Sequence, residues 1–268
     1  MNINSTFIER YSLPLFLILT PLLSLAVAVF LPLPIELIVL LMLLVPSTLA
    51  ILCAALGEGS KGVSELLRKL FQWRIDFKWH VIALTLPVGM ILLADILAFL
   101  VGWSPTIQFH IPASSQLIVN FILIALVAVL EELGWRGYAL PRLMVHRSPL
   151  SSALIVGLLW GLLHIGLGLV DGRPWLPTFL TPFGLSVVMT WLFVHTRGSL
   201  AMAMLFHFAI DYSPQFLLFG LAIEQAVWAQ AIISLAVAFI LMALFGTNLQ
   251  RVPTKVQAMV GAGQADIK

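Results

Sequence analysis

Long apolar stretches dominate this 268-residue chain, and each can cross a lipid bilayer as a helix. A transmembrane helix needs about 20 apolar residues to span roughly 30 Å of hydrocarbon. We expect spans near residues 13–31, 35–56, 79–102, 116–137, 149–170, 178–196, 199–219 and 223–246. Only 10% of the residues are charged, against about a quarter in soluble domains. The sequence therefore predicts an all-α integral membrane protein with about eight transmembrane helices.

The positions of the basic residues predict an orientation, because Lys and Arg concentrate in cytoplasmic loops. With the N-terminus inside, twelve of the 14 basic residues fall in cytoplasmic segments, one in an outer segment, and Arg136 at a span end. The twelve are Arg10, Lys61, Arg68, Lys69, Arg74, Lys78, Arg142, Arg147, Arg197, Arg251, Lys255 and Lys268, and the outer one is Arg173. We expect a single multi-pass domain over residues 1–268 in the plasma membrane of a prokaryote, with both termini cytoplasmic.

Two segments between the spans carry specific predictions. In residues 57–78, apolar residues recur at helical spacing opposite basic ones, which predicts an amphipathic helix on the inner leaflet. Such a helix serves either to capture substrate or lipid or simply as a basic surface helix. Residues 138–148 are expected to leave the membrane, because Pro141 cannot continue a regular helix.

One span ends in a group of charged residues. Glu131, Glu132 and Arg136 follow the apolar run 117–130, although a charge near a helix centre costs roughly 2.5–3.5 kcal/mol on insertion scales. Residues four apart share a helix face, so we expect Glu132 and Arg136 to form an ion pair. Glu131 lies about 100° round the helix from Glu132 and is left without a local cation. We therefore expect a supporting role for the pair and a general-base role for Glu131.

A further ionisable residue, His164, lies in the span near residues 149–170. Trp160 precedes it by one helical turn, and Gly157 and Gly161 provide a small-residue face for close helix packing. A lone intramembrane histidine is either a hydrogen-bonded packing residue or part of a site. The unpaired carboxylate of Glu131 elsewhere in the bundle keeps the second interpretation open.

His207 and Asp211 form a third polar pair, four residues apart on one helix face. The carboxylate could orient the imidazole, as carboxylates do beside catalytic and metal-bound histidines; alternatively the pair only joins helices. Because three polar sites occur in three separate spans, we expect them to converge in one polar cavity. Asp95, alone in another span, fits a structural role better.

Several catalytic and ligand-binding sequences are absent. The chain has no H-E-x-x-H, no G-x-S-x-G and no G-K-[ST] sequence, so we expect no nucleotide cofactor. A net charge of +2 is too small to suggest nucleic acid as a partner. No internal repeat supports an inverted-repeat transporter.

Three ordered motifs resemble those of the CPBP family, which groups type II CAAX prenyl endopeptidases with bacteriocin-processing and Abi-like immunity proteins. The first is Glu131-Glu132-x-x-x-Arg136, followed by Gly137-Tyr138-x-Leu140-Pro141. Trp160-x-x-x-His164 is similar to the second motif, usually Phe-x-x-x-His. His207-x-x-x-Asp211 is similar to the third, usually His-x-x-x-Asn.

The resemblance implies an eight-helix fold with a polar cavity open to the cytoplasmic side and a catalytic core at about residues 116–220. It also implies hydrolysis of a peptide bond near a substrate C-terminus without an acyl-enzyme. By the resemblance, Glu131 and His164 would activate water, and His207 and Asp211 would hold the oxyanion or help form the site. Glu132 and Arg136 would support them. Aspartate at 211 departs from the family pattern, because a carboxylate repels an oxyanion unless it is protonated.

The family is often described as metalloproteases, which makes Zn²⁺ a candidate cofactor. Its candidate ligands are Glu131, His164, His207 and Asp211, since one Glu and two His can hold zinc with an open position. The main interpretation is an intramembrane endopeptidase that acts on a membrane protein or lipidated peptide. The alternatives are a non-enzymatic immunity or scaffold protein with the same cavity and a small proton-coupled transporter.

Overall fold

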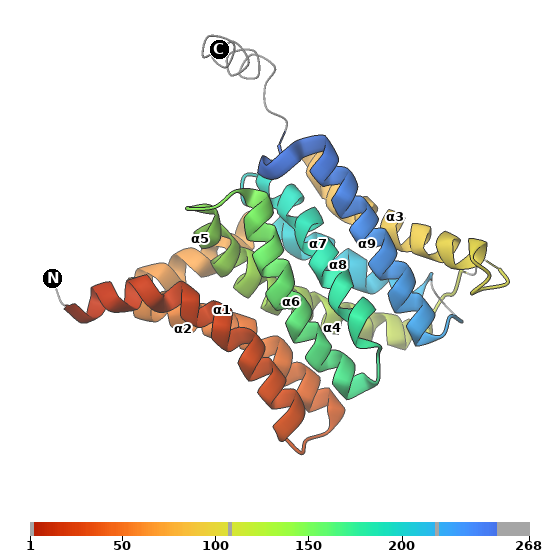
Figure 1. The fold of residues 1–268 in the computed structure, drawn as a ribbon, viewed down its shortest axis with the longest axis horizontal. Helices are drawn as coiled ribbons and strands as arrows, with labels where there is room; N and C mark the ends of the chain where they lie inside the picture. Colours follow the sequence, from red (N-terminus) through yellow and green to blue (C-terminus); the bar gives the residue numbers. More distant parts are fainter. Residues whose placement is uncertain (1–2, 107–108, 218–219, 251–268) are drawn as a thin grey trace, which may run out of the picture.

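The computed structural model describes residues 3–106, 109–217 and 220–250, with side chains from residue 11 onward. Every regular element in these ranges is a helix (Figure 1). The long helices are α1 (Ile3–Phe30), α2 (Ile35–Arg68), α3 (Phe77–Leu100), α4 (Ser114–Glu132), α6 (Pro149–Asp171), α7 (Trp175–His195) and α9 (Ile223–Phe245). The shorter ones are a π-helical turn (Leu133–Ala139), α5 (Leu140–Met144) and α8 (Leu200–Tyr212), besides three 3-10 turns, Lys69–Phe71, Ser213–Gln215 and Gly246–Asn248. The predicted all-α membrane fold is confirmed.

Seven helices in the described residues are long and apolar enough to cross a membrane. The expected span at 199–219 is instead α8, which has 13 residues and ends in the 3-10 turn Ser213–Gln215. Thirteen residues rise only about 20 Å, short of the hydrocarbon thickness. Because α8 packs between α3 and α4 inside the bundle, with much of its length buried, it does not need to match the bilayer.

The small-residue face predicted on α6 is a close helix contact. A Cβ on Gly161 would lie 2.6 Å from the Phe179 ring, and one on Gly157 would lie 2.9 Å from the Phe183 carbonyl oxygen. No side chain larger than hydrogen fits there without moving α7. Glycine at both positions therefore lets α6 and α7 form one of the most extensive helix pairs in the bundle.

The predicted amphipathic segment is helical, as the second part of α2. Gly59 has φ 67° and ψ −159°, which breaks the helix direction and needs a residue without a Cβ. Beyond this kink, Leu66 is buried while the side chain of Lys61 is exposed. Lys69 then donates a hydrogen bond to the Gly137 carbonyl oxygen (2.8 Å), which joins this segment to the π-helical turn.

The expected break of the helix at Pro141, within residues 138–148, is wrong. The helix passes through the π-helical turn into α5 and ends at Met144, and Tyr138 and Leu140 are fully buried. The amide of Leu140 bonds to the carbonyl of Trp135, five residues back. Pro141 lies in the first turn of α5, where a missing N–H is tolerated.

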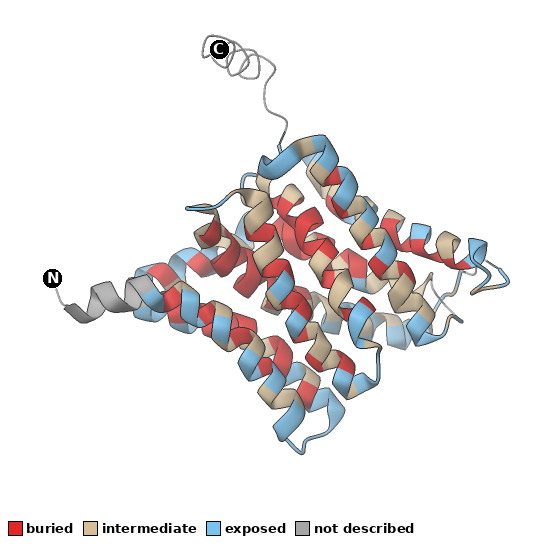
Figure 2. Cartoon of the chain, viewed as in Figure 1, coloured by how far each residue is buried: buried red, intermediate tan, exposed pale blue. Residues whose placement is uncertain are grey.

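Burial follows this packing (Figure 2). Buried residues concentrate in the π-helical turn, α7 and α8, whereas α1 and α9 carry many exposed apolar side chains. Phe239 is 70% and Leu169 63% exposed. Large exposed apolar side chains over whole helices are expected where the solvent is lipid.

Candidate active site

Glu132 lies at the centre of a buried polar network at the end of α4. Its Oε1 accepts hydrogen bonds from Arg136 Nη1 (2.9 Å) and from His207 Nδ1 on α8 (2.8 Å). The pairing with Arg136 is the predicted one, and both side chains are completely buried. The bond to His207 was not predicted. One carboxylate thus compensates a buried guanidinium and fixes an imidazole at the same time.

Glu131 faces away from this pair, toward α6. Its Oε2 accepts a 2.8 Å hydrogen bond from the indole N–H of Trp160. The Arg136 guanidinium lies over the face of the same indole, 4.5 Å from the ring centroid. Glu131 Oε1 is buried and has no hydrogen-bond partner among the described residues. One oxygen of this carboxylate is therefore held in place by Trp160, while the other is buried without a described partner.

His164 is half-buried and lies one turn beyond Trp160. Its Nδ1 is 2.9 Å from the Trp160 carbonyl oxygen. Because a carbonyl oxygen only accepts, Nδ1 carries the proton in a neutral ring, which leaves a lone pair on Nε2. This tautomer suits a base or a metal ligand.

Carboxylates flank both nitrogens of His207. Asp211 Oδ2 lies 3.2 Å from Nε2, while Glu132 occupies Nδ1. Glu131 Oε2 is the next carboxylate oxygen, 3.8 Å from Nε2. A doubly protonated ring could donate to Glu132 and Asp211 together. This distance fits the orienting role that was one of the two alternatives predicted for Asp211.

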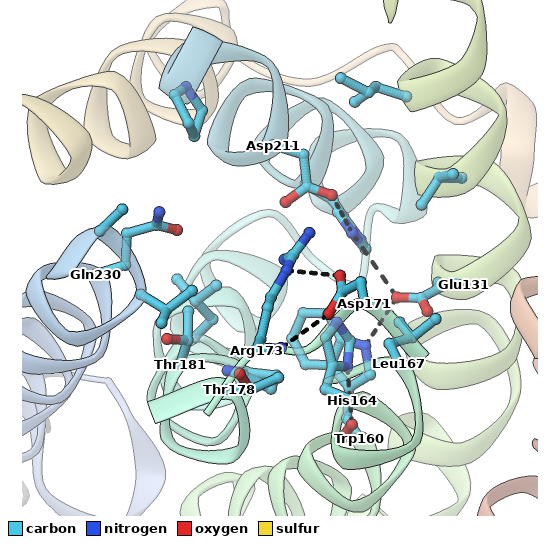
Figure 3. Close-up of a pocket in the computed structure, with 18 of the residues that line it drawn as sticks. Glu131, Trp160, His164, Leu167, Asp171, Arg173, Thr178, Thr181, Asp211 and Gln230 are labelled. Carbon is cyan, nitrogen blue, oxygen red and sulfur yellow. Dashed lines mark hydrogen bonds and ion pairs between the residues drawn. The ribbon is translucent and has the colours of Figure 1, made fainter. Parts of the chain in front are cut away.

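A cavity of about 600 Å³ joins these side chains (Figure 3). It is enclosed by α2, α4, α6, α7, α8 and α9, and Glu131, His164, His207 and Asp211 all line it. Glu132 and Arg136 do not line it and support it from behind. The predicted convergence of three polar sites in one cavity is therefore present.

The cavity has a buried end and an exposed end. Glu131 and His207 are buried, whereas Asp211, Asp171 and Arg173 are exposed. The Arg173 Nε is 2.7 Å from Asp171 Oδ2, and Figure 3 shows this pair beside the space that Glu131 and Asp211 face. We call the exposed end, formed by Asp171, Arg173, Asp211 and Ile223, the mouth.

The position of the mouth tests two predictions together: that both termini are cytoplasmic, and that the cavity opens to the cytoplasm. The mouth lies at the end of the bundle that holds the α6–α7 connection, the end of α8 and the start of α9. The described parts of the predicted cytoplasmic segments lie at the opposite end. Cytoplasmic termini and a cavity open to the cytoplasm therefore cannot both hold.

The comparisons with known proteins agree with the motifs. A family model described as type II CAAX prenyl endopeptidase Rce1-like matches residues 113–213. Residues 113–213 are thus similar to an Rce1-like domain. The chain is also similar to a Methanococcus maripaludis protein named CAAX prenyl protease 2, with 28% identity over 191 residues, 65% of this chain and 70% of that protein. The predicted family resemblance is confirmed.

The donor chemistry of the Rce1-like domain suits zinc only in part. Both His164 and His207 bond through Nδ1, to a carbonyl and a carboxylate, as metal-binding histidines do. Among the described residues, however, no three His, Cys, Asp or Glu side chains converge closely enough to hold a metal ion. Glu131 Oε2 and Asp211 Oδ2 already have partners. The side chains would have to move to bind zinc, and zinc stays a prediction.

Sequence reasoning missed several residues of the Rce1-like site. Trp160 was noted only as an aromatic motif residue, although its N–H binds the key carboxylate. Arg173 entered only the topology count, and Gln230 on α9 was not considered. The sequence could have indicated Gln230 as a site residue, because it is a polar residue within an apolar span. Nothing local could have placed α9 at the cavity, because α9 reaches it by packing against α7 and α3.

Proposed function

We propose that this protein is an intramembrane endopeptidase that hydrolyses a peptide bond of a membrane-associated substrate by direct attack of water. The observation that carries the proposal is Glu131: a buried carboxylate with one oxygen held by Trp160 and the other free, at the deep end of a cavity lined by His164 and His207. The Rce1-like domain and the protease name of the relative support the same reaction class.

In this proposal the Glu131 carboxylate accepts a proton as the water oxygen attacks the scissile carbonyl carbon. His164 presents an Nε2 lone pair to the same cavity and orients that water. The tetrahedral intermediate then collapses, the C–N bond breaks, and the proton held by Glu131 passes to the leaving amine. No covalent bond to the protein forms, so no nucleophilic Ser or Cys is required.

In this proposal His207 is an imidazolium whose positive charge stabilises the negative charge that develops on the carbonyl oxygen. Glu132 and Asp211 hold its ring at both nitrogens, and an imidazolium between them is favoured by their charge. A preorganised cation or hydrogen-bond donor is the largest single contribution in many acyl-transfer sites. Arg136 neutralises Glu132, so that the network does not add net negative charge beside the oxyanion.

The central test is hydrolysis by the purified protein of a lipidated peptide and of an unlipidated transmembrane peptide. Glu131→Gln and His164→Ala should each lower kcat by roughly 10²–10⁴-fold, the usual contribution of a general base. Asp95→Asn is the matched control, because Asp95 is also a buried acid in a membrane helix but does not line the cavity. Full activity in either site variant would overturn the proposed mechanism, whereas no hydrolysis of either peptide by the unaltered protein would favour a non-enzymatic immunity or scaffold role.

A zinc-dependent version of the same hydrolysis is the second candidate, favoured by the Nδ1 bonds of His164 and His207. Zinc would lower the pKa of a bound water to about 7, with Glu131, His164, His207 and Asp211 as its candidate ligands. Elemental analysis of an active preparation decides between the two versions. About one zinc per chain, with activity lost to a chelator and restored by zinc, would support it, whereas full activity well below that content would exclude it.

A further inference from the structure

The depth of each side chain shows where the cavity opens. His164 lies seven residues before the end of α6 at Asp171, which places it about 10 Å below that end. Asp211 is the next-to-last residue of α8, and Ile223 is the first residue of α9. These residues all line the cavity, and the outer three are exposed. A substrate therefore enters past the end of α6 and the start of α9.

The other end of the bundle is closed behind the site. Trp135 and Tyr138 in the π-helical turn are fully buried. Arg142 covers the Tyr138 ring, with its guanidinium carbon 3.8 Å from the ring centroid, and forms an ion pair with Glu58. Lys69 bonds to the backbone of the turn. Glu131 is therefore reached from the mouth and not from this side.

The basic residues divide between these two ends. Apart from the buried Arg136, the described basic side chains at the closed end are Lys61, Arg68, Lys69, Arg74, Lys78, Arg142, Arg147 and Arg197. The mouth end holds Arg173, and that residue is paired with Asp171. Lys and Arg in short loops stay on the cytoplasmic side during insertion. The closed end is thus the cytoplasmic one.

We propose that the cavity opens on the non-cytoplasmic face of the membrane and receives peptide segments presented at the outer leaflet. In Figure 1 the α6–α7 connection and the start of α9 lie in the lower part of the view, whereas α9 ends at the top, so the two ends are well separated. The claim that the cavity receives peptides rests on the proposed function, but the direction in which the cavity opens does not. The substrate class that follows is an exported or outer-leaflet-anchored polypeptide, rather than one held in the cytoplasm.

Single-cysteine labelling in intact bacterial cells tests the direction of opening. Cys53, the one cysteine of the chain, is buried and away from the cavity, so Cys53→Ala provides the background. Ala222→Cys adds an exposed thiol next to the mouth, and Ser60→Cys and Thr247→Cys add exposed thiols at the closed end. A membrane-impermeant maleimide should label position 222 in intact cells. It should label positions 60 and 247 only after permeabilisation.

Labelling of all three thiols in detergent confirms that each is reactive. Labelling of positions 60 and 247 from outside, or equal labelling of both ends, would overturn the proposal. Val227→Cys lies deeper, on the part of α9 that lines the cavity, and a small impermeant thiol reagent should reach it from outside as well. Failure of that reagent to reach position 227 from outside, with reaction after permeabilisation, would also count against an outward mouth.

Sealed vesicles of known orientation then test whether substrate is hydrolysed from the side of the membrane on which the mouth opens. A membrane-impermeant peptide substrate added outside should be cleaved by right-side-out vesicles and spared by inside-out vesicles. Outward labelling with no proteolysis in either preparation would leave the direction of opening intact and sink the proposed function. Cleavage by inside-out vesicles alone would support the peptidase and overturn the outward cavity.

Discussion

At the scale of single residues, the site depends on how buried charges compensate one another. Glu132 uses one oxygen for both Arg136 and His207, and its Oε2 has no partner among the described residues. Arg136 likewise leaves Nε and Nη2 without a described partner, with the Trp160 ring against its face. In a low-dielectric interior such a network is stable only while its charges balance.

Breaking that balance should destabilise the protein more than removing both charges. Arg136→Met leaves Glu132 buried without its cation, and should lower the unfolding free energy by roughly 3–5 kcal/mol. Adding Glu132→Gln removes the stranded charge while its amide oxygen still accepts from His207, so the double variant should recover most of the loss. Thermal unfolding in detergent measures both. A double variant no more stable than Arg136→Met would show that charge balance is not the role of the pair.

The indole N–H of Trp160 is expected to hold Glu131 in position. Trp160→Phe keeps an aromatic ring against Arg136 but removes the hydrogen bond to Oε2, and a bond to a charged group contributes roughly 1.5–3 kcal/mol. We expect kcat for peptide hydrolysis to fall about tenfold or more with KM little changed. Trp191→Phe is the control, because the Trp191 N–H has no partner among the described residues. Equal effects of the two substitutions would mean that ring size, not the bond, matters.

Helical spacing alone predicted the contact between Glu132 and Arg136, because both residues lie on one helix. The bonds from His207 to Glu132 and from Trp160 to Glu131 join residues on different helices. No local rule specifies such contacts. The motifs indicated that these residues belong together, and only the packing of α4, α6 and α8 shows which nitrogen faces which oxygen.

At the scale of elements, the π-helical turn after α4 positions the motif. It packs against α2 at Gly134, where a Cβ would lie 2.7 Å from the Pro46 Cβ and 2.8 Å from its backbone carbonyl. A Pro on α2 thus meets a Gly in the turn. The prediction that Pro141 ends this helix placed the end too early. The helix continues from the wider π-helical turn into α5, and Pro141 lies in the first turn of α5.

Gly134→Ala should force α2 and the turn apart. Contacts that short with backbone atoms cannot relax by rotating a side chain, so we expect a loss of roughly 1–3 kcal/mol in stability, as for other overpacked sites, together with reduced hydrolysis. Gly89→Ala is the matched control, since a Cβ on Gly89 of α3 meets nothing within 4 Å. That substitution should be neutral or slightly stabilising through helix propensity. Similar thermal stabilities for the two variants would contradict the close contact.

At the scale of the whole molecule, composition predicted the membrane fold and the basic residues predicted an orientation. The sequence could not show at which end the cavity opens, because that depends on where α8 stops and on which helix ends remain apart. α8 has 13 residues and ends beside Asp211, so the cavity is open at that end. A span of ordinary length in that place would extend into the space that the mouth occupies.

The cavity is therefore expected to be the path of the substrate, and a bulky residue near its mouth should obstruct it. Ala226 lines the cavity in the first turn of α9, whereas Ala243, on the same helix, is exposed near its other end. Ala226→Trp should lower kcat/KM for a membrane-presented peptide by about tenfold, which corresponds to about 1.4 kcal/mol. Ala243→Trp should leave it unchanged, because its side chain adds bulk outside the cavity. Unaltered hydrolysis by a correctly folded Ala226→Trp variant would mean that substrate reaches Glu131 by another route, between helices rather than through the mouth.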